Sequence, residues 1–187
     1  MRITDLLKKD AVLLHASATD KQTAIDTLIS LHEKAGNLTD VAQYKADILA
    51  REALGTTAIG EGIAVPHAKS EAVKTPSLSA MTVPDGVDYE APDGNPAKLL
   101  FMIAATPDGD MHLEILSRLM VMLMEPEFAE SLMQAKTADE FLLLIDEKDI
   151  DRLKEIFVSR QECQEINDEI KTKLSSDSVR LAVIENQ

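Results

Sequence analysis

Two of the four histidines lie where an imidazole could act on an anionic group. His67 directly follows Pro66, whose ring fixes φ and stiffens the approach to the histidine. Ile63-Ala64-Val65, just before them, is a short apolar run typical of a strand, and Gly60 and Gly62 precede it. An unperturbed imidazole has a pKa of about 6.5, so a neutral nucleophile is available at cellular pH. The stretch predicts a rigidly presented histidine that could be a nucleophile.

The two glycines before this run shape the loop that leads to it. Gly60 and Gly62 can adopt backbone conformations and close approaches that other residues forbid. Such a loop can expose several N–H groups toward an anion. A GxG is common in loops, however, and this one lacks the GK[ST] of a P-loop. The loop therefore indicates an anion site without identifying its ligand.

The second candidate, His112, lies in the first turn of a helix predicted over 110–124. It precedes Leu116 by four residues and Leu119 by seven, which places it on the inward face. A helix N-terminus disfavours imidazolium, so we expect His112 to stay neutral. A histidine on an apolar helix face is more often a core residue than a reactive one, and the spacing alone leaves both interpretations open.

Arg51 lies near the end of a helix predicted to start after Thr39 or Asp40. It follows Tyr44 by seven residues and Ile48 by three, on the face that these apolar residues mark as buried. A cation in the last turn stabilises the helix dipole. An arginine aimed along the buried stripe could instead reach into a pocket. The residues alone support both interpretations equally.

The remaining ligand types give weaker signals. His15 ends a predicted strand, and His32 lies on a charged helix end, where we expect a solvated surface residue. Cys163 is the one cysteine, which rules out an internal disulfide and favours a reducing cytosol. The chain has no zinc ligand set, the carboxylates show no distinctive pairing, and no serine lies in a nucleophile elbow.

Composition limits the classes of protein that fit. With 187 residues, 45% of them hydrophobic, the chain can form one sizeable core and an appendage. The net charge of −14 argues against a nucleic-acid surface and against an anionic bilayer, and suits a basic patch on a partner protein. No segment approaches the roughly 18 apolar residues of a membrane span, and no apolar signal-peptide run opens the chain.

The order of elements predicts an α/β sandwich, with a mixed β-sheet flanked by helices. Residues 99–105 form a continuous apolar run of strand length, which indicates a central strand buried on both faces. Thr19 and Gln22 are spaced as a capping box for a helix that Gly36 ends, and Thr137 and Glu140 are spaced as another. Further strands are expected at 11–14, 57–59 and 78–83, and further helices at 126–136 and 137–147.

The chain changes character near Asp149, so we divide it into a domain at 1–148 and a segment at 149–187. We interpret that segment as a helical linker or C-terminal extension, broken at Ser175-Ser176-Asp177 and followed by a short strand at 179–184. Apolar residues recur in it with spacings of seven, three, four and four, at Ile156, Cys163, Ile166, Ile170 and Leu174.

Residues 51–68, REALGTTAIGEGIAVPHA, resemble the signature of the IIA domains of the bacterial sugar phosphotransferase system, in the fructose/mannitol class (type 2). The shared pattern is an arginine, a threonine, a glycine turn and an apolar run that ends in Pro-His. Residues 104–119, AATPDGDMHLEILSRL, are similar to a second family element in which a histidine opens a helix. The resemblance covers about residues 1–147 and implies a mixed sheet flanked by helices.

The resemblance also implies a role for each candidate residue. His67 matches the phosphoryl-accepting histidine, His112 an accessory active-site histidine, and Arg51 an arginine close to the phosphate. Gly60 and Gly62 fall in the loop before the nucleophile, and the first is the more regular member of the pattern. The family implies attack through Nε2, with Nδ1–H held by a backbone carbonyl. No metal or cofactor is implied, because the phosphoryl group passes between two similar nitrogens.

The implied partners are the phosphocarrier HPr as donor and a cysteine of a IIB domain as acceptor. That IIB domain would pass the phosphate to a sugar that enters through a membrane IIC domain, with fructose as the first candidate and mannitol as the second. The implied location is the cytoplasm. Cys163 does not match the IIB cysteine, because it lies in RQECQEIND on a helical face. The segment 149–187 could lead to an absent IIB domain or could pack as a terminal extension.

Two alternatives to sugar transport remain at this level. Nitrogen-type IIA proteins use the same fold as a regulatory phosphoswitch for protein partners. A domain that only binds a small anion would also fit the histidine and arginine pattern.

Overall fold

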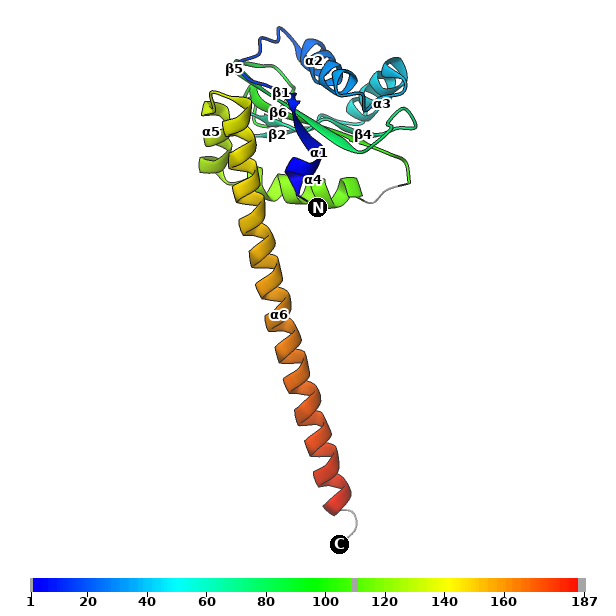
Figure 1. The fold of residues 1–187 in the computed structure, drawn as a ribbon, viewed down its shortest axis with the longest axis vertical. Coiled ribbons are helices and arrows are strands. Elements are labelled where there is room, and N and C mark those ends of the chain that lie inside the picture. Colours follow the sequence, from blue (N-terminus) through cyan, green and yellow to red (C-terminus); the bar gives the residue numbers. More distant parts are fainter. Residues whose placement is uncertain (1, 109–110, 185–187) are drawn as a thin grey trace. The chain divides into compact units, whose positions relative to one another are not determined.

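The computed structural model describes residues 2–108 and 111–184, and the side chains of 111–113 and of several residues beyond Phe157 are not described. Within these limits a six-stranded mixed sheet lies between two layers of helices (Figure 1). The helices are α1 (Ile3–Leu6), α2 (Lys21–Lys34), α3 (Val41–Ala53), α4 (Met111–Leu123), α5 (Pro126–Gln134) and α6 (Ala138–Ile184). The strands are β1 (Leu7–Leu13), β2 (Ala58–Gly60), β3 (Ile63–Ala64), β4 (His67–Lys69), β5 (Ser77–Val87) and β6 (Ala97–Ala105).

The sheet has the order β1-β5-β6-β3-β2, and β4 also pairs with β6. β5 runs antiparallel to β6, whereas β3 and β4 both run parallel to it. The predicted α/β sandwich with a mixed sheet is therefore confirmed.

The central strand β6 is buried on both faces, as its unbroken apolar run predicted. Leu99 and Phe101 pack into a core with α1, α4, α5 and the start of α6. Leu100 and Met102 pack into a second core under α2 and α3. Successive side chains of a strand point to opposite faces, so the alternation follows directly from strand geometry.

The start of α2 differs from its prediction. Asp20 is the N-cap, and its carboxylate accepts a hydrogen bond from the Thr23 N–H at 2.7 Å. The capping box predicted from Thr19 and Gln22 is wrong, because a carboxylate one residue later both accepts the free N–H and offsets the positive helix end. Asp40 caps α3 in the same way, which confirms one of the two predicted starts.

Helix α6 begins as predicted and ends much later. The Glu140 N–H donates to the Thr137 hydroxyl at 3.2 Å, so Thr137 caps this helix. The helix continues to Ile184, so the predicted end near 147, the break at Ser175-Ser176-Asp177 and the strand at 179–184 are wrong. No glycine or proline interrupts this stretch, and a helix satisfies its own backbone groups, whereas an added strand needs a neighbouring strand.

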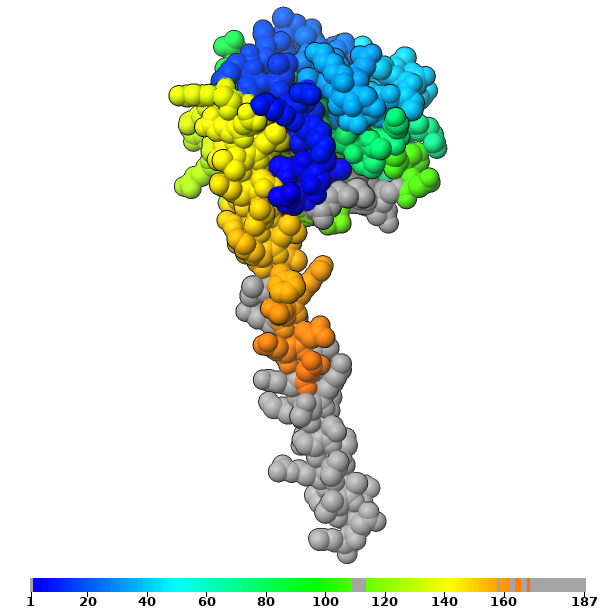
Figure 2. All heavy atoms as spheres, in the orientation of Figure 1, coloured from blue at the N-terminus to red at the C-terminus, as the bar shows by residue number. Residues whose placement is uncertain are grey.

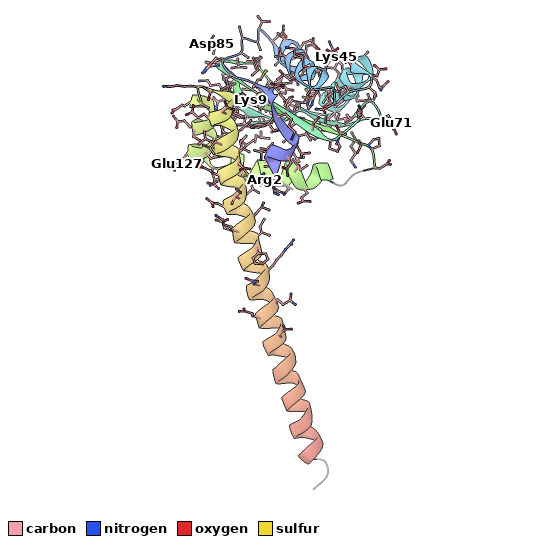
Figure 3. All side chains as sticks on the ribbon, viewed as in Figure 1. Arg2, Lys9, Lys45, Glu71, Asp85 and Glu127 are labelled. Atoms are coloured by element: carbon pink, nitrogen blue, oxygen red, sulfur yellow. The ribbon has the colours of Figure 1, made fainter. Side chains whose placement is uncertain are left out.

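The chain forms two compact units, residues 1–149 and 150–187. Figure 2 shows α1 on the surface of the first unit, against the first turns of α6. There Asp146 accepts hydrogen bonds from the Arg2 guanidinium and the Thr4 hydroxyl, and Lys9 pairs with Asp139 at 2.5 Å. Figure 3 labels Arg2 and Lys9 at this place. In the second unit Phe157 is 62% exposed on the helix. None of the helices in the described residues is long and apolar enough to cross a membrane.

Candidate functional site

His67 is the first residue of β4 and lies opposite Ile103 of β6 in a parallel pair. The sequence placed it at the exit of a strand, but the chain passes through Pro66 and pairs again with the same neighbour. Ala68 belongs to the core under α2 and α3. Because side chains alternate along a strand, the half-buried His67 faces the layer that contains α4.

The imidazole of His67 is fixed by the backbone two residues earlier. Its Nδ1 lies 2.8 Å from the carbonyl oxygen of Val65. A carbonyl oxygen can only accept, so Nδ1 carries the proton in the neutral ring and Nε2 keeps a lone pair. The geometry thus gives His67 the tautomer in which Nε2 is the nucleophilic nitrogen.

The turn between β2 and β3 has positive φ at three successive residues, Gly60 (92°), Glu61 (54°) and Gly62 (76°). The Glu61 N–H donates to a carboxylate oxygen of Asp93 at 2.8 Å. A Cβ on Gly60 would lie 3.0 Å from the same oxygen. This N–H therefore serves an internal carboxylate, and the pKa of Asp93 is lowered because backbone N–H groups of Glu61 and Asn95 donate to it.

Arg51 lies in the last turn of α3, and its Nη1 donates to the carbonyl oxygen of Gly55 at 3.1 Å. The side chain is half-buried and lies in the last turn of α3, where a cation offsets the helix dipole, and its hydrogen bond reaches the loop beyond the helix end. The buried stripe of α3 consists of Tyr44, Ile48 and Glu52, so the residue that continues inward is Glu52.

His112 is the second residue of α4, Met111–Leu123, and residue 110, where the helix was predicted to begin, lies outside the described residues. Its side chain lies outside the described part of the structure, so its orientation and its distance from His67 stay predictions. Leu119 and Leu123 of this helix are buried as expected. Leu116 and Met120 are only half-buried, and Ile115 and Met122 join the core in their place.

Sequence reasoning missed a buried polar cluster around Glu52. Its carboxylate accepts hydrogen bonds from the hydroxyl and the N–H of Thr57 and from the Tyr89 hydroxyl. Lys21 pairs with it at 3.0 Å and also with Glu90 at 2.7 Å. Burial opposes the charge of Lys21, but hydrogen bonds to Glu90 and Glu52 outweigh burial and raise the pKa of the lysine. The signal was the position of Glu52, four residues after Ile48.

The prediction that His32 is a solvated surface residue is wrong. Its side chain is fully buried, with Nδ1 3.0 Å from the Ser77 hydroxyl and the ring edge-on to Tyr44. Burial lowers its pKa to about 4, although the Met102 backbone partly opposes the shift. The missed signal was its spacing of seven from Ile25 and four from Leu28, which are core residues of the same helix.

A separate hollow of about 390 Å³ lies between the β2–β3 turn and the junction of α4 and α5. Its lining includes Ile59, Glu61, Ile63, Met124 and Met133, but neither His67 nor Arg51. The candidate nucleophile His67 is thus a side chain presented at the start of a strand, and it does not line this hollow. Among residues with described side chains, no three His, Cys, Asp or Glu gather as a metal site would require.

Comparisons with known proteins define the class. Residues 5–148 match the family described as "Phosphoenolpyruvate-dependent sugar phosphotransferase system, EIIA 2". The chain belongs to this family, whose IIA components are phosphotransferases with a phosphohistidine intermediate.

Among its relatives, the chain is 44% identical over 150 residues to the fructose-specific EIIABC component of Bacillus subtilis, covering 80% of this chain and 24% of the relative. It is 34% identical to the 2-O-alpha-mannosyl-D-glycerate-specific EIIABC component of Escherichia coli, covering 79% of this chain and 23% of that protein. The chain thus spans about a quarter of these two relatives. It covers 96% of the mannitol-specific IIA component of Geobacillus stearothermophilus at 37% identity, in a match over 76% of this chain.

Solved structures agree on the fold. The nitrogen regulatory protein IIA-Ntr of Neisseria meningitidis has a TM-score of 0.71 at 27% identity, covering 75% of this chain and 97% of that one. The IIA subunit in a complex of IIAMtl with phosphorylated IIBMtl from Escherichia coli has a TM-score of 0.65 at 28% identity, covering 75% of this chain and 98% of that one.

Proposed function

We propose that this chain accepts a phosphoryl group on His67 from phospho-HPr and passes it to a cysteine of a IIB domain, in the uptake of fructose or a related sugar. The observation that carries the proposal is the hydrogen bond from His67 Nδ1 to the Val65 carbonyl, because it leaves the Nε2 lone pair as the nucleophile. Membership of the EIIA 2 family supports the class of reaction.

The transfer balances without a co-reactant. The Nε2 lone pair of His67 forms a new N–P bond while the N–P bond of the donor phosphohistidine breaks, and the electron pair of that bond returns to the donor ring. Bond formed and bond broken are of the same kind, so the step is close to thermoneutral and reversible. The protein has mainly to orient the ring and to stabilise the equatorial phosphoryl oxygens. We assign that charge stabilisation to Arg51 and a hydrogen bond to His112.

Fructose is the preferred sugar because the fructose-specific relative is 44% identical, against 37% for the mannitol-specific one. A IIA domain does not contact the sugar, so this preference concerns the IIB and IIC partners. In the proposal, residues 149–187 are a linker or extension beyond the domain at 1–148. Both phosphoryl transfers, from HPr to His67 and from His67 to the IIB cysteine, then take place in the cytoplasm.

A regulatory phosphoswitch is the second candidate. The nitrogen regulatory protein of Bradyrhizobium diazoefficiens is 30% identical over 139 residues, and a IIA-Ntr structure shares the fold. Such a protein would accept phosphate on the same histidine and would use the charge as a signal to protein partners.

The decisive experiment mixes the chain with phosphorylated HPr and measures incorporation of phosphate by mass. The wild-type chain should gain one phosphoryl group, and His67→Ala should gain none while keeping its fold. Phosphate on the His67→Ala chain would refute the assignment of the nucleophile. His112→Ala should accept phosphate more slowly but still accept it.

A second measurement separates transport from regulation. The phosphorylated chain is offered purified fructose-type and mannitol-type IIB domains, and loss of its phosphate is followed. Rapid transfer to the fructose-type domain supports the proposal. Failure to phosphorylate either IIB domain would favour the regulatory role.

A further inference from the structure

We propose that Glu52 is a positioning residue for His67, acting through Thr57 and Val65. The inference rests on the proposed role of His67 as nucleophile. Glu52 touches none of the reacting atoms, so its effect must pass through the chain that fixes the imidazole.

The first link is between Glu52 and Thr57. The Glu52 side chain is 5% exposed, and one of its oxygens accepts the Thr57 hydroxyl while the other accepts the Thr57 N–H at 3.3 Å. Both donors of Thr57 are therefore held by one carboxylate. This closes the loop between α3 and β2 at its base, and the Arg51 guanidinium binds Gly55 within the same loop.

The second link joins Thr57 to His67. The carbonyl of Thr57 accepts the N–H of Val65 at 3.0 Å, and the carbonyl of Val65 accepts Nδ1–H of His67 at 2.8 Å. A continuous series of hydrogen bonds thus leads from the buried carboxylate to the imidazole. The bonds act on the backbone of Thr57 and of Val65, so the series orients the ring by fixing the position of the carbonyl that the last bond uses.

Val65 depends on this series because the neighbouring strands do not hold its N–H. β3 ends at Ala64 and β4 begins at His67, so Val65 lies between the two ladders. The next residue, Pro66, has no N–H to donate, although its carbonyl accepts the Ile103 N–H at 3.0 Å. The position of the Val65 carbonyl is consequently set by Thr57 on one side and by the ring of His67 on the other.

The carboxylate is itself anchored from two other elements. Lys21, at the start of α2, lies 3.0 Å from Glu52 and 4.9 Å above the Tyr89 ring, and the Tyr89 hydroxyl donates to Glu52 at 3.3 Å. A charge buried with this many partners cannot shift without losing several bonds. Thr57 is thereby tied to α2 and to the segment after β5, independently of its own short strand.

The test uses two variants that each alter one polar side chain, Thr57→Val and Glu52→Gln, and two controls that leave the polar groups in place. Thr57→Val removes the hydroxyl at nearly constant volume, and Thr57→Ser keeps it. Glu52→Gln keeps the shape but removes the charge and one acceptor. Ile48→Val, in the buried stripe of the same helix, is the control for a stability loss that leaves the hydrogen bonds untouched. Two properties are measured in each: the 15N signals of the His67 ring and the rate of phosphoryl transfer from phospho-HPr.

In the wild type and in Thr57→Ser and Ile48→Val, the ring should be in the Nδ1–H tautomer. In Thr57→Val and Glu52→Gln the ring should become a mixture of the two tautomers. The kcat of phosphoryl transfer should fall by up to about 100-fold with KM little changed, because a misplaced nucleophile slows the chemical step but does not weaken the binding of phospho-HPr. Unchanged tautomer and unchanged kcat in either variant would overturn the proposal. If Glu52→Gln does not fold, the Thr57 pair decides alone.

The outcome is separable from failure of the proposed function. The tautomer is read without HPr, so it reports on the hydrogen-bond series even if the chain transfers no phosphate. A wild-type chain that accepts phosphate on His67, together with a Thr57→Val chain that matches it in both measurements, leaves the function intact and removes Glu52 from it.

Discussion

Asp149 is fully buried and accepts hydrogen bonds from Nη2 of Arg118 on both carboxylate oxygens, at 2.6 and 2.7 Å. The Ile3 N–H donates to the same carboxylate at 2.8 Å. One acid at the edge of the first compact unit thus joins α1, α4 and α6, which are far apart in the sequence. Burying a charge is unfavourable unless it is paired and hydrogen-bonded in this way.

Asp149→Asn should lower the free energy of unfolding by about 3 kcal/mol, because it removes the charge of the buried carboxylate that Arg118 contacts at 2.6 Å, and the exposed Glu114 at 3.4 Å is a weaker partner. Urea unfolding measures the change. Asp151→Asn, an exposed pair two residues later, is the control and should change stability by less than about 0.5 kcal/mol. Equal stability of the two variants would show that the buried pair contributes nothing.

Truncations on either side of Asp149 test where the first compact unit ends. A chain that stops after Leu153 should keep the melting temperature and the phosphate acceptance of the full chain, because the first compact unit ends at Asp149. A chain that stops after Lys148 should lose several degrees, since it lacks this carboxylate. Thermal unfolding of the two truncations decides, and a melting temperature that already falls in the longer one would place stabilising contacts beyond Asp149.

His32 should make the fold less stable in acid. Its pKa is about 4 in the folded chain and about 6.5 when unfolded, so between these values the unfolded chain binds the extra proton. The stabilisation is complete above about pH 6.5 and is lost as the pH falls toward 4, by about 3 kcal/mol in total. Unfolding free energies of wild type and His32→Leu at pH 7.5, 5.5 and 4.5 test this. The unfolding free energy of wild type minus that of His32→Leu should fall as the pH is lowered from 7.5 to 4.5, by most of that amount. A difference that stays constant over these pH values would contradict the prediction.

Arg51→Gln should slow phosphoryl transfer by about 100-fold, because the proposed function assigns stabilisation of the phosphoryl charge to this cation. Arg51→Lys keeps the charge without the planar fork and should recover part of the rate. Stability should change little in both, since the Arg51–Gly55 contact is exposed. Rapid-quench transfer from phospho-HPr measures the rates. An Arg51→Gln chain with wild-type rate would leave Arg51 only its position in the last turn of α3 and its bond to Gly55.

Phosphorylation should fall on Nε2 of His67. The Nδ1–H bond to Val65 blocks the other nitrogen and would have to break for Nδ1 to react. Coupling between phosphorus and the ring nitrogens in a 15N-labelled phosphorylated chain identifies the site. A phosphorus coupled to Nδ1 would mean that the ring turns before it reacts.

Periodicity in the sequence was enough for the layers of the fold. The apolar run of β6 and the helical spacing of Tyr44 and Ile48 in α3 predicted which faces are buried, because these patterns follow from strand and helix geometry alone. In α4 the spacing predicted the buried face only in part, since Leu116 and Met120 are half-buried. The start of α2 and the length of α6 were missed, since caps and helix ends depend on competition between neighbouring residues that spacing does not resolve.

The sequence predicted the part of the candidate site that depends on neighbouring residues, around His67, and missed the part that depends on distant ones. Pro66 and the glycines are local signals, so the presentation of His67 could be expected from a few adjacent residues. Glu52 and His32 were missed because a polar residue at a buried helix position has the residue type expected at the surface. Their burial becomes understandable only with their partners on other elements, Lys21 for Glu52 and Ser77 for His32. Those partners are 31 and 45 residues away along the chain, a separation that no local pattern reports.

The strand position of His67 bears on how partners could read the modification. A phosphate on Nε2 would add nearly two negative charges to a ring that the β4–β6 ladder and the Val65 carbonyl already hold still. We expect the modified and unmodified domains to share one backbone shape. A partner must then tell them apart by local potential, against the background of a chain that already carries −14. Recognition of this kind weakens as salt is added, whereas recognition of a changed shape would not.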